Sequence, residues 1–95
     1  MITTMLMMAA TLSWVEPTTR EDGTAMTTEE ISHYVLYRND VAELQIPAPA
    51  TTADVTKNGH WYITAVDIDD QESAPSNVVH IKGKPSAPSN LQRVK

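Results

Sequence analysis

Hydrophobic and polar side chains alternate along several short segments of this chain, which is the pattern of β-strands rather than of helices. In residues 10–15, Leu12 and Trp14 alternate with Thr11 and Ser13. One face of this segment is therefore apolar and the other hydroxylic, as in a strand that covers a core on one side only.

The same alternation predicts five further strands. They are residues 33–38, 41–46, 51–56, 60–67 and 76–82. The strongest pattern lies in residues 60–67, where both faces carry substantial side chains. One face holds Trp61, Ile63 and Ala65, and the other holds Tyr62, Thr64 and Val66.

Turn residues separate these segments. Asn39 and Asp40 form a turn pair, and Gly59, which can take positive φ, ends a tight turn that begins at Lys57. Residues 18–28 read as a long polar loop, and we expect residues 28–31 to continue it rather than form a helical turn. Strands joined by turns without helices predict two antiparallel sheets packed face to face, in an all-β sandwich of about seven strands.

The composition narrows the function classes. A chain of 95 residues has room for one domain, and the absence of cysteine leaves stability to the core alone. The net charge of -5 argues against a nucleic-acid partner, because phosphate binding needs a concentrated basic patch. The apolar run at residues 5–10 is far shorter than the roughly 20 residues of a membrane span. Residues 1–10 also lack the positive charge that opens a secretory signal.

Two clusters of titratable residues are candidates for a metal-binding site. His60 and His80 face outward on neighbouring predicted strands, but two histidines are fewer than the three or four ligands of a zinc site. Residues 67–72 contain four carboxylates, although neither the spacing nor the glycine of a calcium loop is present. We expect surface histidines, including His33, and an acidic, solvated hairpin tip. A weak calcium site at that tip is the alternative.

No catalytic constellation is recognisable. The chain has no Gly-x-Ser-x-Gly elbow and no glycine-rich phosphate loop, and no nucleophile is paired with a base. We therefore expect no enzymatic activity, no catalytic residues and no cofactor.

Four short motifs occur in a distinctive order. They are Leu12-Ser-Trp14 followed by Pro17, then residues 34–39 (YVLYRN), 63–67 (ITAVD) and 72–77 (ESAPSN). In this order they resemble the fibronectin type III family, especially the modules of bacterial secreted enzymes and phage virion proteins. The resemblance implies an immunoglobulin-like, two-sheet antiparallel β-sandwich over residues 1–83, and a location outside the cell, on its surface or in a virion.

Core positions follow from the alternation and from this resemblance. They are Leu12, Trp14, Tyr34, Leu36, Trp61, Ile63, Ala65, Val79 and Ile81. The family usually ties the corner before its sixth strand with a tyrosine hydroxyl. Gly59 stands in that place here, so we expect the tie to be missing and that end to be less rigid.

Residues 84–95 resemble the proline-marked first strand with which members of the family begin. One interpretation is the start of a following module, left as a flexible tail. The other is a strand supplied to its own domain or to a neighbour's, which would link copies into a strand-swapped homo-oligomer. Residues 2–8 offer a competing first strand.

The remaining candidate is a surface. By alternation, one outward sheet face carries Val35, Tyr37, Tyr62, Thr64, Val78 and His80. Aromatic groups on such a face bind partners efficiently, although cross-strand pairs also stabilise sheets without a ligand. The expected function is a non-catalytic interaction or spacer module for protein partners or neighbouring modules. The alternative is a carbohydrate-binding accessory module in which Tyr37 and Tyr62 stack on sugars.

Overall fold

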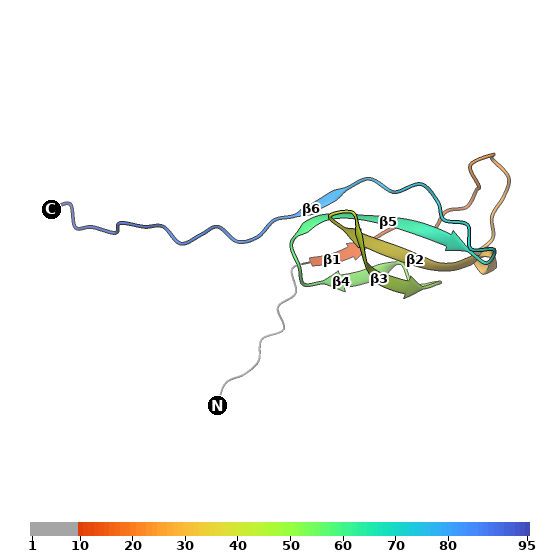
Figure 1. Ribbon diagram of the computed structural model, residues 1–95, viewed down its shortest axis with the longest axis horizontal. Coiled ribbons are helices and arrows are strands. Elements are labelled where there is room, and N and C mark those ends of the chain that lie inside the picture. Colours follow the sequence, from red (N-terminus) through yellow and green to blue (C-terminus); the bar gives the residue numbers. More distant parts are fainter. Residues whose placement is uncertain (1–9) are drawn as a thin grey trace, which may run out of the picture.

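The computed structural model describes residues 10–95 and shows an all-β chain with two antiparallel sheets (Figure 1). Its strands are β1 (Ala10–Ser13), β2 (Ile31–Arg38), β3 (Val41–Pro47), β4 (Thr52–Val55), β5 (Gly59–Asp67) and β6 (Val79–Ile81). One sheet pairs β1 with β4, and the other has the order β3-β2-β5-β6. The expected strand at residues 2–8 lies outside the described residues.

Each of the six segments with period-two alternation contains a strand, but β1, β4 and β6 are shorter than predicted, β6 by the most. Residues 76–78 are not part of β6, because serine side chains take the place of ladder carbonyls beside β5. The Ser73 hydroxyl accepts the Ala65 N–H and the Ser76 hydroxyl accepts the Ile63 N–H, at 2.9 and 3.0 Å. Residues 72–78 therefore follow the edge of β5 without forming a regular ladder.

The prediction of a loop at residues 28–31 is also wrong in part. Residues Thr28–Glu30 form a 3₁₀ turn, η1, which leads directly into β2. The Glu30 carboxylate accepts the Thr27 N–H at 3.0 Å, which satisfies a backbone donor at the start of the turn.

The two sheets share one apolar core. Its buried centre is Leu36, Val55 and Trp61, which come from β2, β4 and β5. Tyr34 is also buried, whereas the other predicted core residues except Val79 are half-buried. Val79 is 42% exposed although it lies opposite Trp61 in the ladder. Val55, 2% exposed, was not among the predicted core positions.

The turns at one end of the sheets are held by side chains. Asn39 and Asp40 have φ of 52° and 67°, as in the tight hairpin turns that match strand twist. Gly59 has φ of 140°, and a Cβ there would lie 2.9 Å from the Arg38 side chain. The Asn39 side chain accepts the His60 N–H, and the Trp61 indole donates to the Lys57 carbonyl. These two bonds hold the corner before β5, for which the sequence predicted no side-chain tie.

β1 begins and β6 finishes at the same end of the sandwich (Figure 1). From there residues 84–95, which we call the tail, run away from the sheets in line with the long axis of the molecule, which extends 70 Å. Every tail residue is exposed.

We expect Leu36→Ala to lower the free energy of unfolding by about 2–5 kcal/mol, because it empties a fully buried site. Leu44 faces Leu36 across the β2–β3 ladder but is 41% exposed. Leu44→Ala is therefore the matched control and should cost roughly 1 kcal/mol or less. Urea denaturation of both variants measures the difference, and equal losses would contradict the assignment of the core.

Candidate interaction surfaces

The ladder registers place the predicted face residues on one side of the four-stranded sheet. Tyr37 lies opposite Tyr62, Val35 opposite Thr64, and His60 opposite His80. Val78 precedes β6 and is 55% exposed. The face therefore exists as a continuous surface across β2 and β5, with β6 at its edge.

The two tyrosines of this face stack on one another. Their ring centroids lie 4.8 Å apart and the ring planes differ by 15°. The Tyr37 hydroxyl also donates to the Glu72 carboxylate at 2.5 Å, and the Thr64 hydroxyl donates to the same oxygen at 2.7 Å. Each ring thus has one side covered by its neighbour, which leaves less aromatic surface for a flat ligand than two separate rings would offer.

These bonds shift the acidity of the groups involved. The hydroxyls of Tyr37 and Thr64 stabilise the ionised carboxylate and hold the pKa of Glu72 below its ordinary value. The same bond raises the pKa of Tyr37, because a carboxylate beside a phenol disfavours its ionisation. Glu72 therefore lies over Thr64 as a charged cover, and this explains why Thr64 is only 5% exposed on an outward face.

The histidine pair is brought together as the alternation predicts. The rings of His60 and His80 stack with centroids 4.0 Å apart and planes 9° from parallel. Within residues 10–95 no three side chains of His, Cys, Asp or Glu converge on one point that could hold a metal ion.

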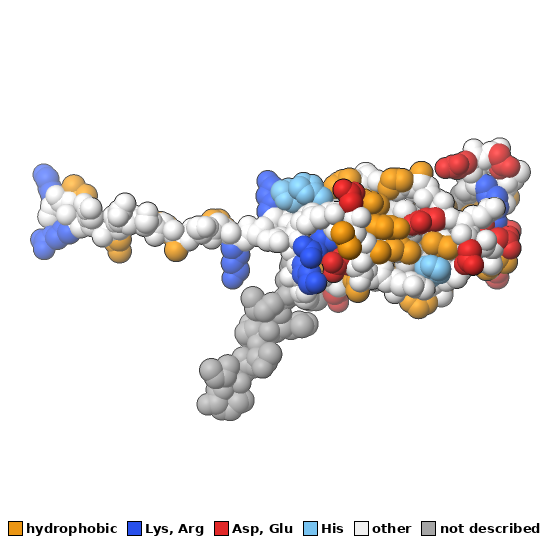
Figure 2. Space-filling model, viewed as in Figure 1, with side chains coloured by type: hydrophobic (Ala, Val, Ile, Leu, Met, Phe, Trp, Pro, Cys, Tyr) orange, Lys and Arg blue, Asp and Glu red, His pale blue; other side chains and the backbone are white. Residues whose placement is uncertain are grey.

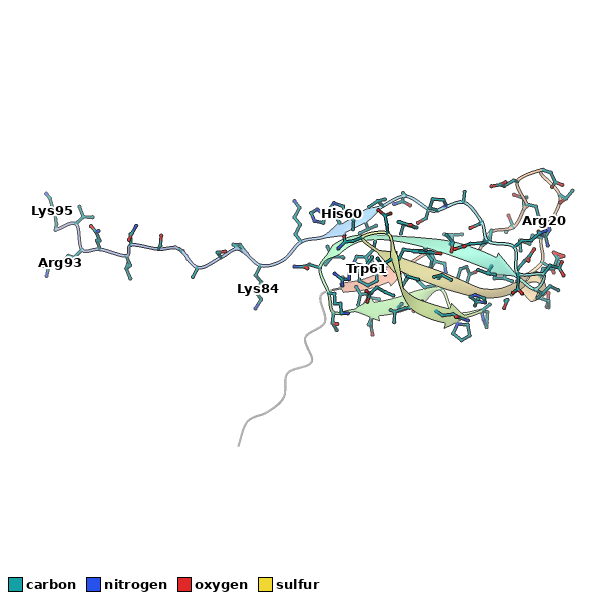
Figure 3. The ribbon with its side chains drawn as sticks, viewed as in Figure 1. Arg20, His60, Trp61, Lys84, Arg93 and Lys95 are labelled. Carbon is teal, nitrogen blue, oxygen red and sulfur yellow. The ribbon has the colours of Figure 1, made fainter. Side chains whose placement is uncertain are left out.

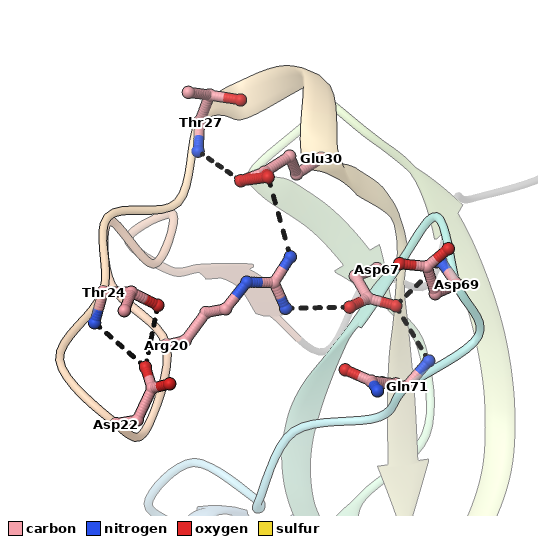
Figure 4. Close-up of polar contacts among 8 residues, drawn as sticks. All are labelled: Arg20, Asp22, Thr24, Thr27, Glu30, Asp67, Asp69 and Gln71. Carbon is pink, nitrogen blue, oxygen red and sulfur yellow. Dashed lines mark hydrogen bonds and ion pairs between the residues drawn. The ribbon is translucent and has the colours of Figure 1, made fainter.

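The acidic segment at residues 67–72 is not a uniformly solvated tip, because its first carboxylate points inward. Asp67 is 3% exposed and accepts the backbone N–H groups of Asp69 and Gln71, both at 2.9 Å (Figure 4). Its other oxygen accepts from the Arg20 guanidinium at 2.9 Å. The Gln71 N–H and then Arg20 hold the pKa of Asp67 below its ordinary value of 3.8.

Arg20 joins three segments at this end of the molecule. Its second nitrogen lies 3.7 Å from the Glu30 carboxylate, so the long loop, the 3₁₀ turn and the end of β5 meet at one guanidinium. No pattern in the sequence predicted this group. The available signal was that Arg20 is the only basic residue among the first 37, in a region rich in carboxylates.

An apolar groove of about 520 Å³ opens between β1 and the segment that leads to β6. Its lining includes Leu12, Trp14, Ile63, Ala65, Ala74 and Val79. Trp14 and Tyr34 both line this groove. The Trp14 indole nitrogen and the Tyr34 hydroxyl are buried and have no hydrogen-bond partner within residues 10–95.

One hydroxyl and imidazole lie within hydrogen-bond distance. Ser32 Oγ and His33 Nδ1 are 2.9 Å apart, but the two residues are adjacent in sequence and Ser32 is exposed. Neither residue lines the apolar groove, and no carboxylate within residues 10–95 accepts a hydrogen bond from the His33 ring. The contact therefore lacks the oriented third group that a nucleophile and base require.

None of the helical turns in the described part of the chain is long and apolar enough to cross a membrane. Comparison with known proteins identified no matching family model, no matching curated protein and no matching solved structure.

We expect Asp67→Asn to remove a stabilising charge whose effect depends on pH. The folded-state pKa of Asp67 is lowered, so its contribution is complete above about pH 4 and is lost as the pH falls through that lowered value. Thermal unfolding from pH 2 to 7 should show the variant well below the native protein at pH 7. The gap should close in acid.

The matched control is Asp70→Asn, in the same turn. Asp70 has φ of 62°, which asparagine tolerates, and its side chain makes no hydrogen bond within residues 10–95. This variant should follow the native curve. A gap for Asp67→Asn that stays constant with pH would contradict the electrostatic explanation.

Proposed function

We propose that this chain is a non-catalytic spacer and interaction module with a fibronectin type III-like sandwich, of the kind found in virion and bacterial surface or secreted proteins. The strand order supports the sandwich. In immunoglobulin-like folds the second and fifth strands are neighbours in one sheet, and the third, sixth and seventh form the other. The pair β1-β4 and the row β2-β5-β6 follow that order when β1 is taken as the second strand.

The observation that carries the spacer role is the set of side-chain bonds at both ends of β5. At one end Arg20 pins the long loop to Asp67, which is buried. At the other end the Trp61 indole holds the turn that precedes β5 through the Lys57 carbonyl, at 3.2 Å. Because β5 has nine residues, it spans roughly 30 Å between these ties. A module fixed in this way keeps the loops at its two ends at a constant separation.

The interaction role rests on the outward face of the four-stranded sheet. Cross-strand aromatic stacking fixes Tyr37 and Tyr62, so a partner that contacts them orders few additional side chains. Val78, 55% exposed, and His80 extend this surface toward the sheet edge. A rigid face with apolar and polar tips suits a protein partner or a neighbouring module.

The rigidity can be measured directly, because the chain contains no cysteine. Spin labels on Glu21→Cys, in the long loop, and Thr56→Cys, at the opposite end, report one distance across the module by pulsed electron resonance. We expect a single narrow distance distribution. Arg20→Ala should broaden it, because the loop then loses its tie to β5.

The control for this experiment is Arg93→Ala, which also removes an arginine but lies in the tail, away from the sheets (Figure 3). It should leave the distribution unchanged. Circular dichroism identifies any variant that has unfolded, and Glu30→Gln, which removes only the longer contact to Arg20, should give an intermediate width. A broad distribution in the native sequence would overturn the spacer proposal.

A further inference from the structure

Among residues 10–95, no strand pairs with the outer edge of β1, the edge that faces away from β4. The Trp14 N–H donates to the Thr51 carbonyl, so the residues in phase with Trp14 direct their backbone groups toward β4. Alternation then directs the backbone groups of Thr11 and Ser13 to the opposite side, where no strand of residues 10–95 lies. An unpaired edge of this kind is a template for another strand.

The apolar groove lies beside this same edge. Leu12 and Trp14 line it from β1, and Val79 lines it from β6. A strand that paired with β1 would place alternate side chains into the groove. A single extended segment with an apolar side chain could therefore pair with the edge of β1 and fill the groove.

The tail has the properties of that occupant. Leu91 and Val94 are 100% and 91% exposed, so their apolar surface is not covered by the tail's own sheets. Residues 91–95 contain no proline and can pair as a strand. In residues 84–90, Pro85 and Pro88 favour an extended backbone. Twelve extended residues span at most about 40 Å, more than the roughly 30 Å of β5, so the tail can reach along a neighbouring module.

The charges of the tail and of the rest of the chain are opposite. Residues 84–95 carry three basic and no acidic side chains, whereas the rest carries four basic and twelve acidic ones. Acidic groups gather at the end of the sandwich away from the tail (Figure 2), and Lys84, Arg93 and Lys95 project from the tail (Figure 3). A head-to-tail arrangement would therefore bring the basic tail of one copy to the acidic end of the next.

The direction of the tail also fits. Figure 1 shows the tail running one way along the long axis and the β1 arrow pointing the other way. A second copy placed ahead on the same axis would present β1 antiparallel to the incoming tail. The tail could reach its own β1 only by reversing near Gly83, and it would then run parallel to β1.

From these observations we propose that the tail of one copy of this chain is the missing strand of the next. Residues 91–95 pair antiparallel with β1 of the second copy and insert Val94 into its groove, because the face of the strand that carries Gln92 and Val94 has no charged side chain. The contact is heterologous, because tail and groove are different surfaces, so it extends into linear chains. This inference rests on the proposed spacer function, since it names a second copy as the neighbouring module.

The test uses two defective full-length variants and their mixture. Leu91→Asp with Val94→Asp disables the tail, and Val79→Asp disables the groove. Ala74→Asp serves as a second groove variant in an exposed segment, should Val79→Asp unfold. Val41→Asp is the matched control, because Val41 is 61% exposed on β3, away from the groove.

Size exclusion with light scattering over a hundredfold concentration range gives the masses. We expect the native chain and Val41→Asp to form a concentration-dependent series of oligomers that shortens in high salt. Each defective variant alone should remain at 10.5 kDa. Their mixture should stop at twice that mass, because only one intact tail and one intact groove can meet.

Nitrogen–proton correlation spectra locate the contact. In the labelled tail variant, addition of the unlabelled groove variant should shift the Trp14 indole signal more than that of Trp61, whose indole is already bonded to Lys57. A native chain that is monomeric at every concentration would overturn the inference, as would oligomers that survive in the tail variant. The distance distribution within one labelled copy does not depend on assembly, so failure here leaves the spacer proposal to its own test.

Discussion

A two-stranded sheet covers a four-stranded one in this molecule, and this difference in width governs how its core is packed. The pair β1-β4 shields Leu36 and Trp61 at the centre, but it leaves Ile63 half-buried and Val79 exposed toward the apolar groove. With no cysteine to add a disulfide, burial must supply most of the stability, and part of the inner face contributes less than a closed sandwich would gain. The groove is a direct consequence of this incomplete cover.

Polar bonds fix the parts that the core does not reach. The long loop has little apolar surface to bury, and the Arg20–Asp67 pair holds it instead. A partly buried pair of this kind gains over solvated ions only when the remaining hydrogen-bonding positions of the buried partner are also filled. Asp67 meets this condition through the N–H groups of Asp69 and Gln71. The loop position therefore depends on the backbone turn after β5 as much as on the ion pair itself.

The strands were predictable because period-two alternation is a local property, and so was the hairpin turn at Asn39. The failures come from interactions between distant segments. Val55 looked like one residue of a short polar strand, and only the pairing of β4 with β1 buries it. Residues 76–78 have strand-like composition, but Ser73 and Ser76 replace carbonyls beside β5. Arg20 and Asp67 are 47 residues apart, so no local pattern links them. The face residues were predictable, whereas the tyrosine stacking that covers one side of each ring was not.

The count of strands connects the groove to the spacer role. Six strands in this order bring the start of β1 and the end of β6 to the same end, so that attachments at residues 10 and 81 would lie side by side. A seventh strand that pairs antiparallel with β1 changes this arrangement. The copy that supplies the strand reaches the module from the opposite end, so the module is then connected at both ends. The strand that closes the core is therefore also the strand that converts a module with both connections at one end into a link with connections at two. If the tail supplies it, the stability of each copy and the length of the assembly depend on the same contact.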